Sequence, residues 1–301
     1  MNQLSPKQII LHCGLHKTGT TYIQRNLQSN QGILLDLGIL YMGPTTFKNQ
    51  CKELWKYIEL GQSKPPIEKI KEQTLTTLMN LAGNKAEQID TVLISFESIF
   101  GTLSKGLIEG NRRRGRKKEN KTGLYRYARK RVKRLINSLE KTLTNNEINW
   151  TILYATRNRE EFIRSCHTQL LKEGNILEDL EFEQFSQSKN FITSNEETLK
   201  RNLEKLKIKQ RIKIAPFSYD INSSKTNPSV YLWNFINLAL PDYNSDIKKA
   251  FDSNSKKINI ANKINPSLSD RGLEIADQAR PLFDQKEWKL FRKFLEKNFA
   301  K

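Results

Sequence analysis

The sequence predicts an α/β fold in which a central parallel sheet is flanked by helices. Short apolar runs alternate with amphipathic segments that are long enough to form helices. Such runs are typical of strands that are buried on both faces, and parallel strands need a crossover between them, which is usually helical. The expected strands are 8–13, 38–42, 91–96, 150–156 and 211–217, the last being weaker in pattern and stopped by Pro216.

The segments between and after these strands have the apolar spacing of helices. The expected helices are Thr20 to about Gln31, most of 50–82 with an interruption near Pro65, and Glu160–Lys172. The last third, from about Asn227, also has helical patterns and shows no clear domain boundary. We therefore expect one domain over residues 1–301, with a basic insertion at about 105–134 and a helical C-terminal region.

Length and composition exclude several classes of protein. The 301 residues approach the upper limit of a single core, and 51 Lys+Arg against 32 Asp+Glu give a net charge of +19. No apolar stretch approaches the roughly 18–20 residues that cross a bilayer, and the N-terminal apolar run is too short for a signal peptide. Cys13, Cys51 and Cys166 lack the spacing of a zinc site or a disulfide framework. We expect a soluble, cytoplasmic protein.

Much of the positive charge lies in one block. Between Lys105 and Arg134 there are 14 Lys+Arg and 2 Glu, a local net charge of +12. Residues 110–123 have the composition of a loop, and 124–143 follow as a helix whose polar face is nearly all Arg and Lys. The block is either a solvated insertion or a binding surface for an anionic partner. Nucleic acid is disfavoured, because two tyrosines, Tyr125 and Tyr127, are too few for a stacking platform.

A glycine-containing turn joins the first strand to the first helix. Its sequence, HKTGTT at 16–21, directly precedes the helical pattern. A turn that opens a helix offers unpaired backbone N–H groups and the positive end of the helix dipole, so it binds phosphate-like anions. The turn is not a Walker A loop, since Lys17 precedes Gly19, whereas that motif has Lys after its second glycine.

This turn resembles the first signature of the sulfotransferases that use 3′-phosphoadenosine 5′-phosphosulfate (PAPS). The resemblance implies a P-loop-like three-layer fold in which the turn cradles the 5′-phosphosulfate. The residues implied for this contact are Lys17, Thr18, Gly19, Thr20 and Thr21, with His16 where many members have proline. The resemblance also implies that Lys17 stabilises charge on the bridging oxygen as sulfate departs.

A second stretch resembles the 3′-phosphate site of the same family. Members have a strand that ends in Arg and a Ser about eight residues further on, and here Arg157 and Ser165 have that spacing. A guanidinium and a hydroxyl are suitable donors for phosphate oxygens. The segments 212–220 and 265–276 resemble bacterial, carbohydrate-directed members, whereas the C-terminal glycine-rich loop of the cytosolic small-molecule members is absent. The resemblance therefore implies a saccharide or glycoconjugate acceptor.

Sulfuryl transfer to a hydroxyl benefits from a general base. Glu97 follows an apolar strand at the end where ligands bind in parallel sheets, and partial dehydration there would raise its pKa toward the working pH. The alternative is that Glu97 caps a turn or pairs with an arginine. We expect His12 to be a packed core residue, His167 to be structural, and His16 to remain a candidate contact of the acceptor. No metal cluster is apparent, so no metal is expected.

Two other functions stay open at this point. A P-loop-like kinase using ATP is disfavoured by the order of Lys17 and Gly19 and by the Arg157/Ser165 pair, which suits a 3′-phosphate that ATP lacks. A polyanion-binding protein that retains the loop as a relic would depend on the basic block instead. The acceptor, its regiochemistry, the adenosine contacts and the oligomeric state are left open by the sequence.

Overall fold

The computed structural model describes residues 4–61, 65–107, 123–143, 147–173, 182–206, 211–219, 228–253 and 268–299. The chain forms two compact units. The sheet unit comprises Met1–Gly101, Tyr127–Thr156 and Glu196–Ile260, and the helical unit comprises Thr102–Arg126, Arg157–Asn195 and Ala261–Lys301. The single domain expected over residues 1–301 stays a prediction. No helix in the described ranges is both long and apolar enough to cross a membrane.

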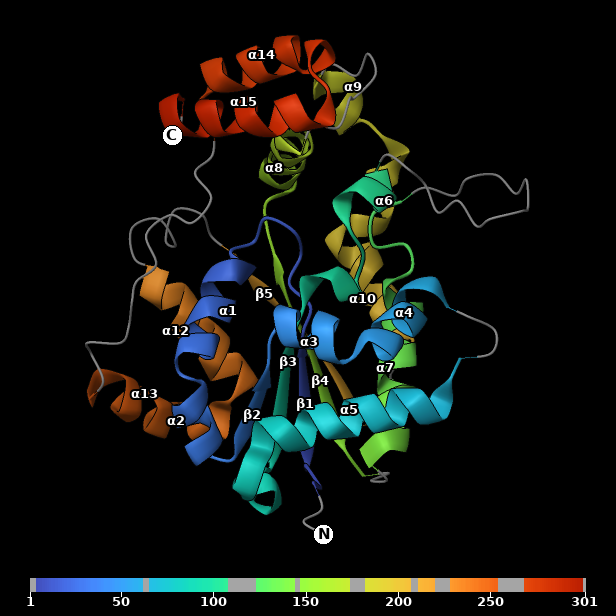
Figure 1. Cartoon of the computed structure of the whole chain (residues 1–301), viewed down its shortest axis with the longest axis vertical. Coiled ribbons are helices and arrows are strands. Elements are labelled where there is room, and N and C mark those ends of the chain that lie inside the picture. Colours follow the sequence, from blue (N-terminus) through green and yellow to red (C-terminus); the bar gives the residue numbers. More distant parts are fainter. Residues whose placement is uncertain are drawn as a thin grey trace. The chain divides into compact units, whose positions relative to one another are not determined.

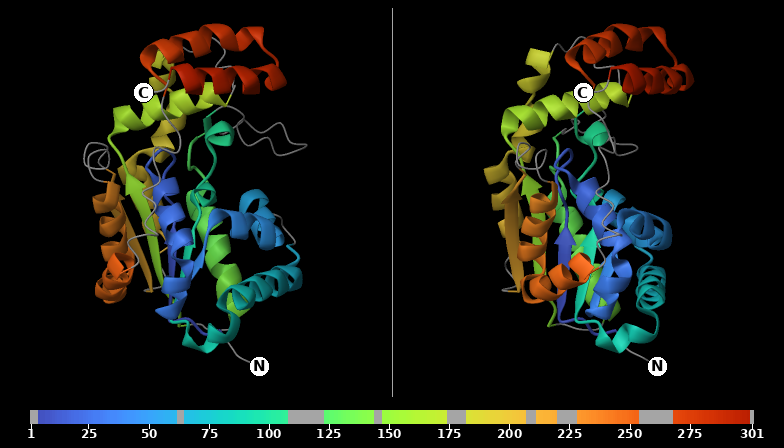
Figure 2. Two further views of the ribbon diagram at one scale, coloured as in Figure 1. Left: turned by 60° about the vertical axis from the view of Figure 1, so that its left-hand side comes forward. Right: turned by 90° about the vertical axis from the view of Figure 1, so that its left-hand side faces the viewer.

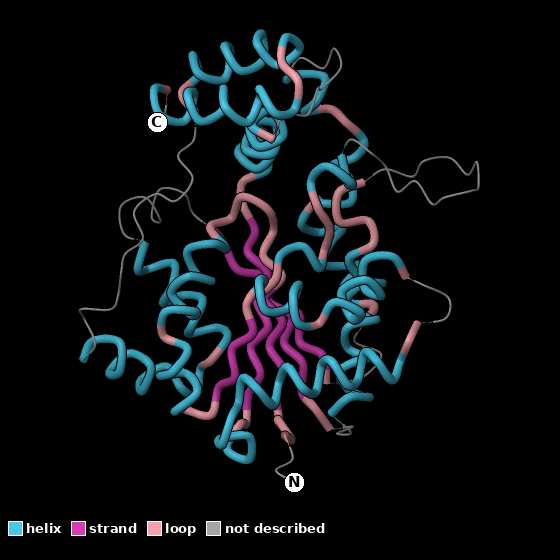
Figure 3. Tube along the Cα trace, viewed as in Figure 1, coloured by secondary structure: helices cyan, strands magenta, loops and turns pink. Residues whose placement is uncertain are grey.

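All strands of the sheet run parallel, in the order β2-β3-β1-β4-β5. Figure 3 shows the strands side by side in the middle of the helices that flank them. The strands are β1 (Gln8–His12), β2 (Ile39–Met42), β3 (Thr91–Ser95), β4 (Asn149–Thr156) and β5 (Ile212–Ser218). Strand β1 is central, and its last residue, His12, lies opposite Ser95 of β3 and Leu153 of β4. The five predicted strands are therefore confirmed to within a few residues.

The prediction that Pro216 stops the last strand is wrong. Strand β5 continues through Pro216 to Ser218, and Pro216 lies opposite Tyr154 of β4. Because β5 is an edge strand, proline is tolerated there, since the N–H it lacks need not serve a further strand.

Helices cover both faces of the sheet, which makes this a P-loop-like three-layer α/β fold (Figure 1 and Figure 2). One face carries α1 (Thr20–Ser29), α2 (Gln31–Asp36), α12 (Pro228–Ala239) and α13 (Asn244–Ser253). The other carries α4 (Lys52–Leu60), α5 (Ile67–Ala82), α7 (Ala128–Leu143) and α10 (Glu196–Glu204). Helix α3 (Pro44–Gln50) precedes α4, and 3₁₀ turns occupy Gly83–Gln88, Glu97–Ile99 and Pro241–Tyr243.

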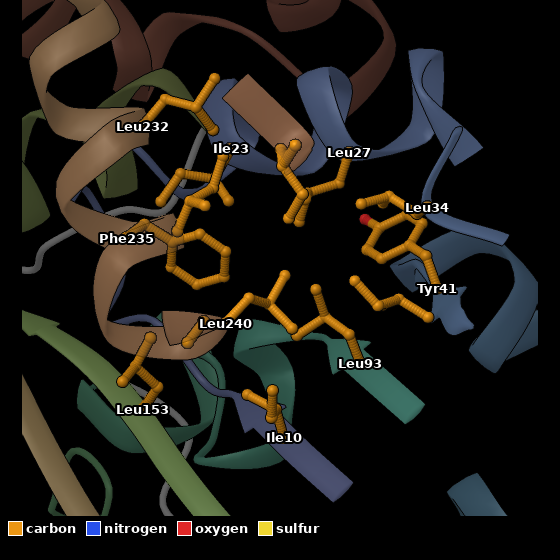
Figure 4. Close-up of a cluster of buried hydrophobic side chains, with 14 of the residues drawn as sticks. Ile10, Ile23, Leu27, Leu34, Tyr41, Leu93, Leu153, Leu232, Phe235 and Leu240 are labelled. Atoms are coloured by element: carbon orange, nitrogen blue, oxygen red, sulfur yellow. The ribbon is translucent and has the colours of Figure 1, made fainter. Parts of the chain in front are cut away.

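A hydrophobic core lies between the sheet and the α1/α12 layer. Ile10, Leu93 and Leu153 come from three adjacent strands, and they pack with Ile23 of α1 and Phe235 of α12 (Figure 4). All five side chains are buried. This packing holds α1 and α12 against the carboxyl half of β1, which is where the turn at 14–19 begins.

The basic helix starts later than the sequence predicts. Helix α7 begins at Ala128, whereas 124–127 form a turn in which Tyr125 has a φ of 62°. Tyr125 is buried and packs near the ring of Phe162, so it offers no surface for stacking on bases. Arg131 donates to the carbonyl of Ser98 and Arg134 to that of Ile58. Part of the basic block therefore consists of residues that pack against, or hydrogen-bond to, the rest of the protein. Residues 108–122, which include most of the predicted loop at 110–123, lie outside the described ranges.

The helical unit has its own small core. It contains α6 (Leu103–Leu107), α8 (Arg159–Lys172), α9 (Phe182–Ser186), α14 (Asp270–Ala279) and α15 (Gln285–Asn298), with 3₁₀ helices at Lys189–Ser194 and Arg280–Leu282. Leu268, Ala276, Trp288 and Leu295 form the core. Trp288 Nε1 donates to the carbonyl oxygen of Lys172 at 3.2 Å, and Lys172 Nζ lies 3.1 Å from Glu296 Oε1. These contacts join α15 to the end of α8.

Candidate functional site

The turn between β1 and α1 has an unusual backbone. Lys17 and Gly19 both adopt left-handed conformations, with φ of 63° and 71°. Positive φ is uncommon for a residue with a side chain, and such conformations gather at functional sites, where the surrounding structure maintains them. Left-handed residues within a turn also direct successive backbone N–H groups to one side, which creates a concave binding site for an anion.

Two hydroxyl groups fix the carbonyls of this turn. Thr18 Oγ1 donates to the carbonyl oxygen of Leu15 at 2.6 Å, within the turn. Tyr231 Oη, from α12, donates to the carbonyl oxygen of Thr18, also at 2.6 Å. Thr18 and Tyr231 are both buried. The turn is therefore held from inside by its own threonine and from outside by a helix that lies more than 200 residues later in the chain.

Two glycines in the turn have no room for a side chain. A Cβ on Gly14 would overlap the side chain of Thr20, and a Cβ on Gly19 would lie 2.7 Å from the ring of Tyr219. Gly19 additionally has the left-handed φ that disfavours other residues. The close approach of Tyr219 and Thr20 therefore requires glycine at both positions.

Helix α1 begins without a side-chain cap. Gly19 occupies the N-cap position, no described side chain caps the helix, and its first turn contains no acidic residue. The N–H groups of Thr20 and Thr21 thus stand at the positive end of the helix dipole. Together with the left-handed turn, this end of α1 has the properties of an anion site.

His16 and Lys17 differ in charge at neutral pH. Both side chains are half-buried. Burial lowers the pKa of His16 to about 4; the nearby Glu97 carboxylate opposes this shift and the Lys17 ammonium adds to it. His16 is therefore neutral at pH 7, which makes Lys17 the cation of the turn, while His16 offers a neutral donor and acceptor.

Glu97 lies beside α1. It is the first residue after Phe96 at the end of β3, it is half-buried, and its Oε2 accepts a hydrogen bond from Gln24 Nε2 at 3.0 Å. The main-chain oxygen of Gln24 in turn accepts from Tyr41 Oη at 3.3 Å. Because Glu97 also acts electrostatically on His16, the structure brings the predicted base and the predicted turn together. Neither predicted alternative for Glu97, a turn cap or an arginine pair, is among the contacts of the described residues.

His12 is a core residue, as predicted. It is buried at the end of β1, its Nδ1 lies 2.9 Å from Ser95 Oγ, and its ring packs against Phe235 with centroids 4.7 Å apart. Within the described part of the chain its Nε2 has no hydrogen-bond partner. This atom lies close beneath the turn, 3.2 Å from where a Cβ on Gly14 would be. Burial lowers the pKa of His12 to about 3, so the ring is neutral.

Arg157 and Ser165 lie in the helical unit. Arg157 directly follows β4, its side chain is 9% exposed, and its Nε donates to Glu161 Oε2 at 3.2 Å. Ser165 is half-buried on α8. On the same helix, His167 packs edge-on against Phe182 and Phe185, and burial lowers its pKa, which fits the structural role predicted for it. A shared role of Arg157 and Ser165 with the turn stays a prediction.

Sequence reasoning missed three residues of this site. Gln24, Tyr219 and Tyr231 contact Glu97, Gly19 and the carbonyl of Thr18 respectively. Tyr219 directly follows β5, at the edge of the sheet where the rule for parallel sheets places ligands, so that rule could have drawn attention to it. Gln24 and Tyr231 occur in ordinary amphipathic helices, and no local pattern distinguishes them.

Comparisons with known proteins add little to this geometry. A scan against protein-family models gives no match, and a search of curated proteins gives none either. A chain in a solved structure described as the PezAT chromosomal toxin–antitoxin system of Streptococcus pneumoniae is 16% identical. The similarity covers 86% of the present chain and 89% of the other, with a TM-score of 0.27, which is too low to carry an argument.

Proposed function

We propose that this protein is a sulfotransferase that moves a sulfuryl group from PAPS to a hydroxyl of a saccharide or glycoconjugate. The observation that carries the proposal is the turn at 14–19, where left-handed Lys17 and Gly19 precede an uncapped helix. Its sequence is the one that resembles the 5′-phosphosulfate loop of that family. A cytoplasmic location belongs to the same proposal.

The residues present fit the phosphosulfate end of this cosubstrate. The two glycines keep the turn narrow, no side chain among the described residues caps the first turn of α1, and Lys17 supplies a positive charge. When bound, PAPS supplies the activated sulfuryl group and leaves as 3′-phosphoadenosine 5′-phosphate. Arg157 and Ser165 are the residues proposed to hold its 3′-phosphate.

The chain's own groups would assist an in-line displacement mainly by position and charge. Lys17 stabilises negative charge that develops on the bridging oxygen. Glu97, oriented by the amide of Gln24, takes the proton of the acceptor hydroxyl. His16 is neutral and adjoins both groups, so it can hydrogen-bond the acceptor without repelling Lys17.

Replacement of Lys17 tests the turn directly. We expect Lys17→Ala to lower kcat by about 1,000-fold or more, because a charge aimed at the developing anion is lost. The fold should persist, since the residue is half-buried and alanine, like lysine, has a Cβ at this left-handed position, so the backbone strain is unchanged. Lys248→Ala, an exposed lysine on α13, is the control. Full activity of Lys17→Ala in a steady-state assay would contradict the assignment.

Calorimetric titration with 3′-phosphoadenosine 5′-phosphate is the first test of the proposal. ADP and ATP serve as comparison ligands, and Arg157→Ala tests the predicted 3′-phosphate contact. We expect binding of the bisphosphate alone, weakened in Arg157→Ala by about tenfold or more. A preference for ATP would favour a kinase instead, and binding of neither nucleotide would refute the proposal.

A further inference from the structure

Tyr231 makes a buried long-range contact with the turn. Its hydroxyl donates to the carbonyl oxygen of Thr18 at 2.6 Å. The ring is 5% exposed and is held between two aromatic residues of β5 and the segment after it. Phe217 stacks on it with centroids 5.7 Å apart, and Tyr219 contacts it edge-on at 4.9 Å. The hydroxyl is therefore fixed in direction as well as in position.

Peptide geometry transmits this direction to the next residue. In a trans peptide, the carbonyl of one residue and the N–H of the following residue point in opposite directions. When the Thr18 carbonyl is drawn toward α12, the Gly19 N–H must point away from α12. The same reasoning applies to Leu15, whose carbonyl accepts from Thr18 Oγ1 and so directs the N–H of His16.

We propose that Tyr231 is a positioning residue for the anion site, because it fixes the Gly19 N–H in the direction that binds the 5′-terminal phosphate or phosphosulfate. Without the hydroxyl, the Thr18–Gly19 peptide is free to rotate, and its carbonyl can face the anion and repel it. Burial raises the pKa of Tyr231 well above its ordinary value, so the hydroxyl remains a donor at neutral pH. The inference rests on the proposed function only in the identity of the nucleotide, and any phosphate that occupies the turn is subject to it.

Tyr231→Phe removes this hydroxyl and keeps the ring. We expect its affinity for 3′-phosphoadenosine 5′-phosphate and for inorganic pyrophosphate to fall about five- to tenfold, the usual effect of one buried hydrogen bond. Affinity for adenosine 3′-monophosphate, which lacks the 5′-phosphate, should stay unchanged. The control is Tyr154→Phe, which removes another buried tyrosine hydroxyl, one without a hydrogen-bond partner within the described ranges.

The outcomes separate this inference from the proposed function. Unchanged pyrophosphate affinity in a folded Tyr231→Phe variant would overturn the inference, and so would an equal loss for adenosine 3′-monophosphate, because that pattern indicates general disruption. If the wild type binds pyrophosphate but not the nucleotide, the proposed function fails while the pyrophosphate comparison still decides the role of Tyr231. A wild type that binds neither probe overturns both.

A measurement on the wild type tests the Gly19 N–H itself, even if Tyr231→Phe does not fold. Selective labelling of the 14 glycines with nitrogen-15 makes the Gly19 amide observable by NMR during a pyrophosphate titration. We expect the Gly19 amide proton to show a large downfield shift at saturation, as a direct donor to an anion does. Saturable binding that leaves the Gly19 resonance in place would overturn the inference.

Discussion

Helices α1 and α8 both follow a strand of the sheet, but they differ in whether a side chain caps the backbone N–H groups of the first turn. Helix α8 has Asn158 as its N-cap, whose Oδ1 accepts from the N–H groups of Glu160 and Glu161 at 3.0 and 3.3 Å. Those two glutamates also place negative charge at the positive end of the helix dipole. Helix α1 has glycine as its N-cap and no acidic residue in its first turn, and no side chain in the described part of the protein caps it.

The comparison shows which helix start is available to an anion. At α8 the N–H groups of Glu160 and Glu161 are already bonded to Asn158, so a phosphate at that junction would depend on a side chain such as Arg157. At α1 the backbone itself is available, and the sequence supplies glycine and threonine where α8 has asparagine and glutamate. A strand followed by a helix is therefore not enough to predict a phosphate loop, because the residues of the first turn decide it.

Giving α1 the negative first turn of α8 should produce the largest effect. We expect Thr21→Glu to weaken binding of inorganic pyrophosphate by about 100-fold, because a carboxylate would lie beside the bound anion. The matched variant Thr21→Gln has the same size without the charge and should bind at least tenfold more tightly than Thr21→Glu. Calorimetric titration measures both, and equal losses would mean that size and not charge is responsible.

The last residues of the strands that lead into the two helices should contribute differently to the pH dependence of the protein's stability. Strand β1 ends in buried His12, whose pKa of about 3 lies below its ordinary value of 6.5, whereas β4 ends in Thr156, which does not titrate. The unfolded chain therefore takes up a proton at His12 first as the pH falls. The contribution of neutral, buried His12 to the stability of the folded protein is therefore complete above pH 6.5. It is lost progressively as the pH falls toward 3.

We expect His12→Gln to reduce this dependence. Between about pH 7.5 and 5.5 the wild type should lose about 1.4 kcal/mol more of its free energy of unfolding than the variant does. Urea denaturation at a series of pH values measures this difference. Parallel stability curves for the two proteins would contradict the assignment of a neutral, buried His12.

Removing the cap of α8 should have a moderate effect on stability. We expect Asn158→Ala to lower the free energy of unfolding by about 1 kcal/mol, because two backbone donors lose their acceptor. Asn158→Ser, which retains a capping oxygen, is the control and should lower the free energy of unfolding clearly less than Asn158→Ala does. Urea denaturation of both variants checks this, and equal stabilities would show that the cap contributes nothing.

The smallest expected effect concerns the ion pair of Arg157. Because Glu161 competes with a 3′-phosphate for this guanidinium, we expect Glu161→Gln to raise affinity for 3′-phosphoadenosine 5′-phosphate about two- to threefold. Glu160→Gln, which removes the partner of Arg164 instead, makes the same change of charge one residue away. Calorimetry of both variants tests the contact, and an equal gain in both would mean that only net charge matters.

The strands and the turn could be predicted because their signals are local. Apolar runs fixed the five strands to within a few residues, and the order of His16 to Thr21 predicted a turn that opens a helix. The end of β5 was misjudged at Pro216, because edge position depends on strand order, which no single segment contains. The start of α7 was misjudged for a similar reason, since Tyr125 is turned inward by packing against Phe162.

The supporting residues of the site depend on contacts between distant segments. Gln24 and Glu97 are 73 residues apart, and Thr18 and Tyr231 are 213 apart. Their side chains obey the ordinary pattern of the helices that carry them, so local propensity provides no sign of their partners. Only the order of the strands, which places β1 beside both β3 and β4, brings these segments together.

The separation of Thr18 and Tyr231 also has a consequence for protein synthesis. At about 5–20 residues per second, the 213 residues that follow Thr18, up to and including Tyr231, take roughly 10–40 s to translate. During this interval the nascent chain already contains the whole of the turn but lacks the hydroxyl that orients it. A prematurely terminated chain that ends before α12 should therefore contain every residue of the phosphate loop and still bind phosphate poorly, so the oriented site forms only after α12 has been made.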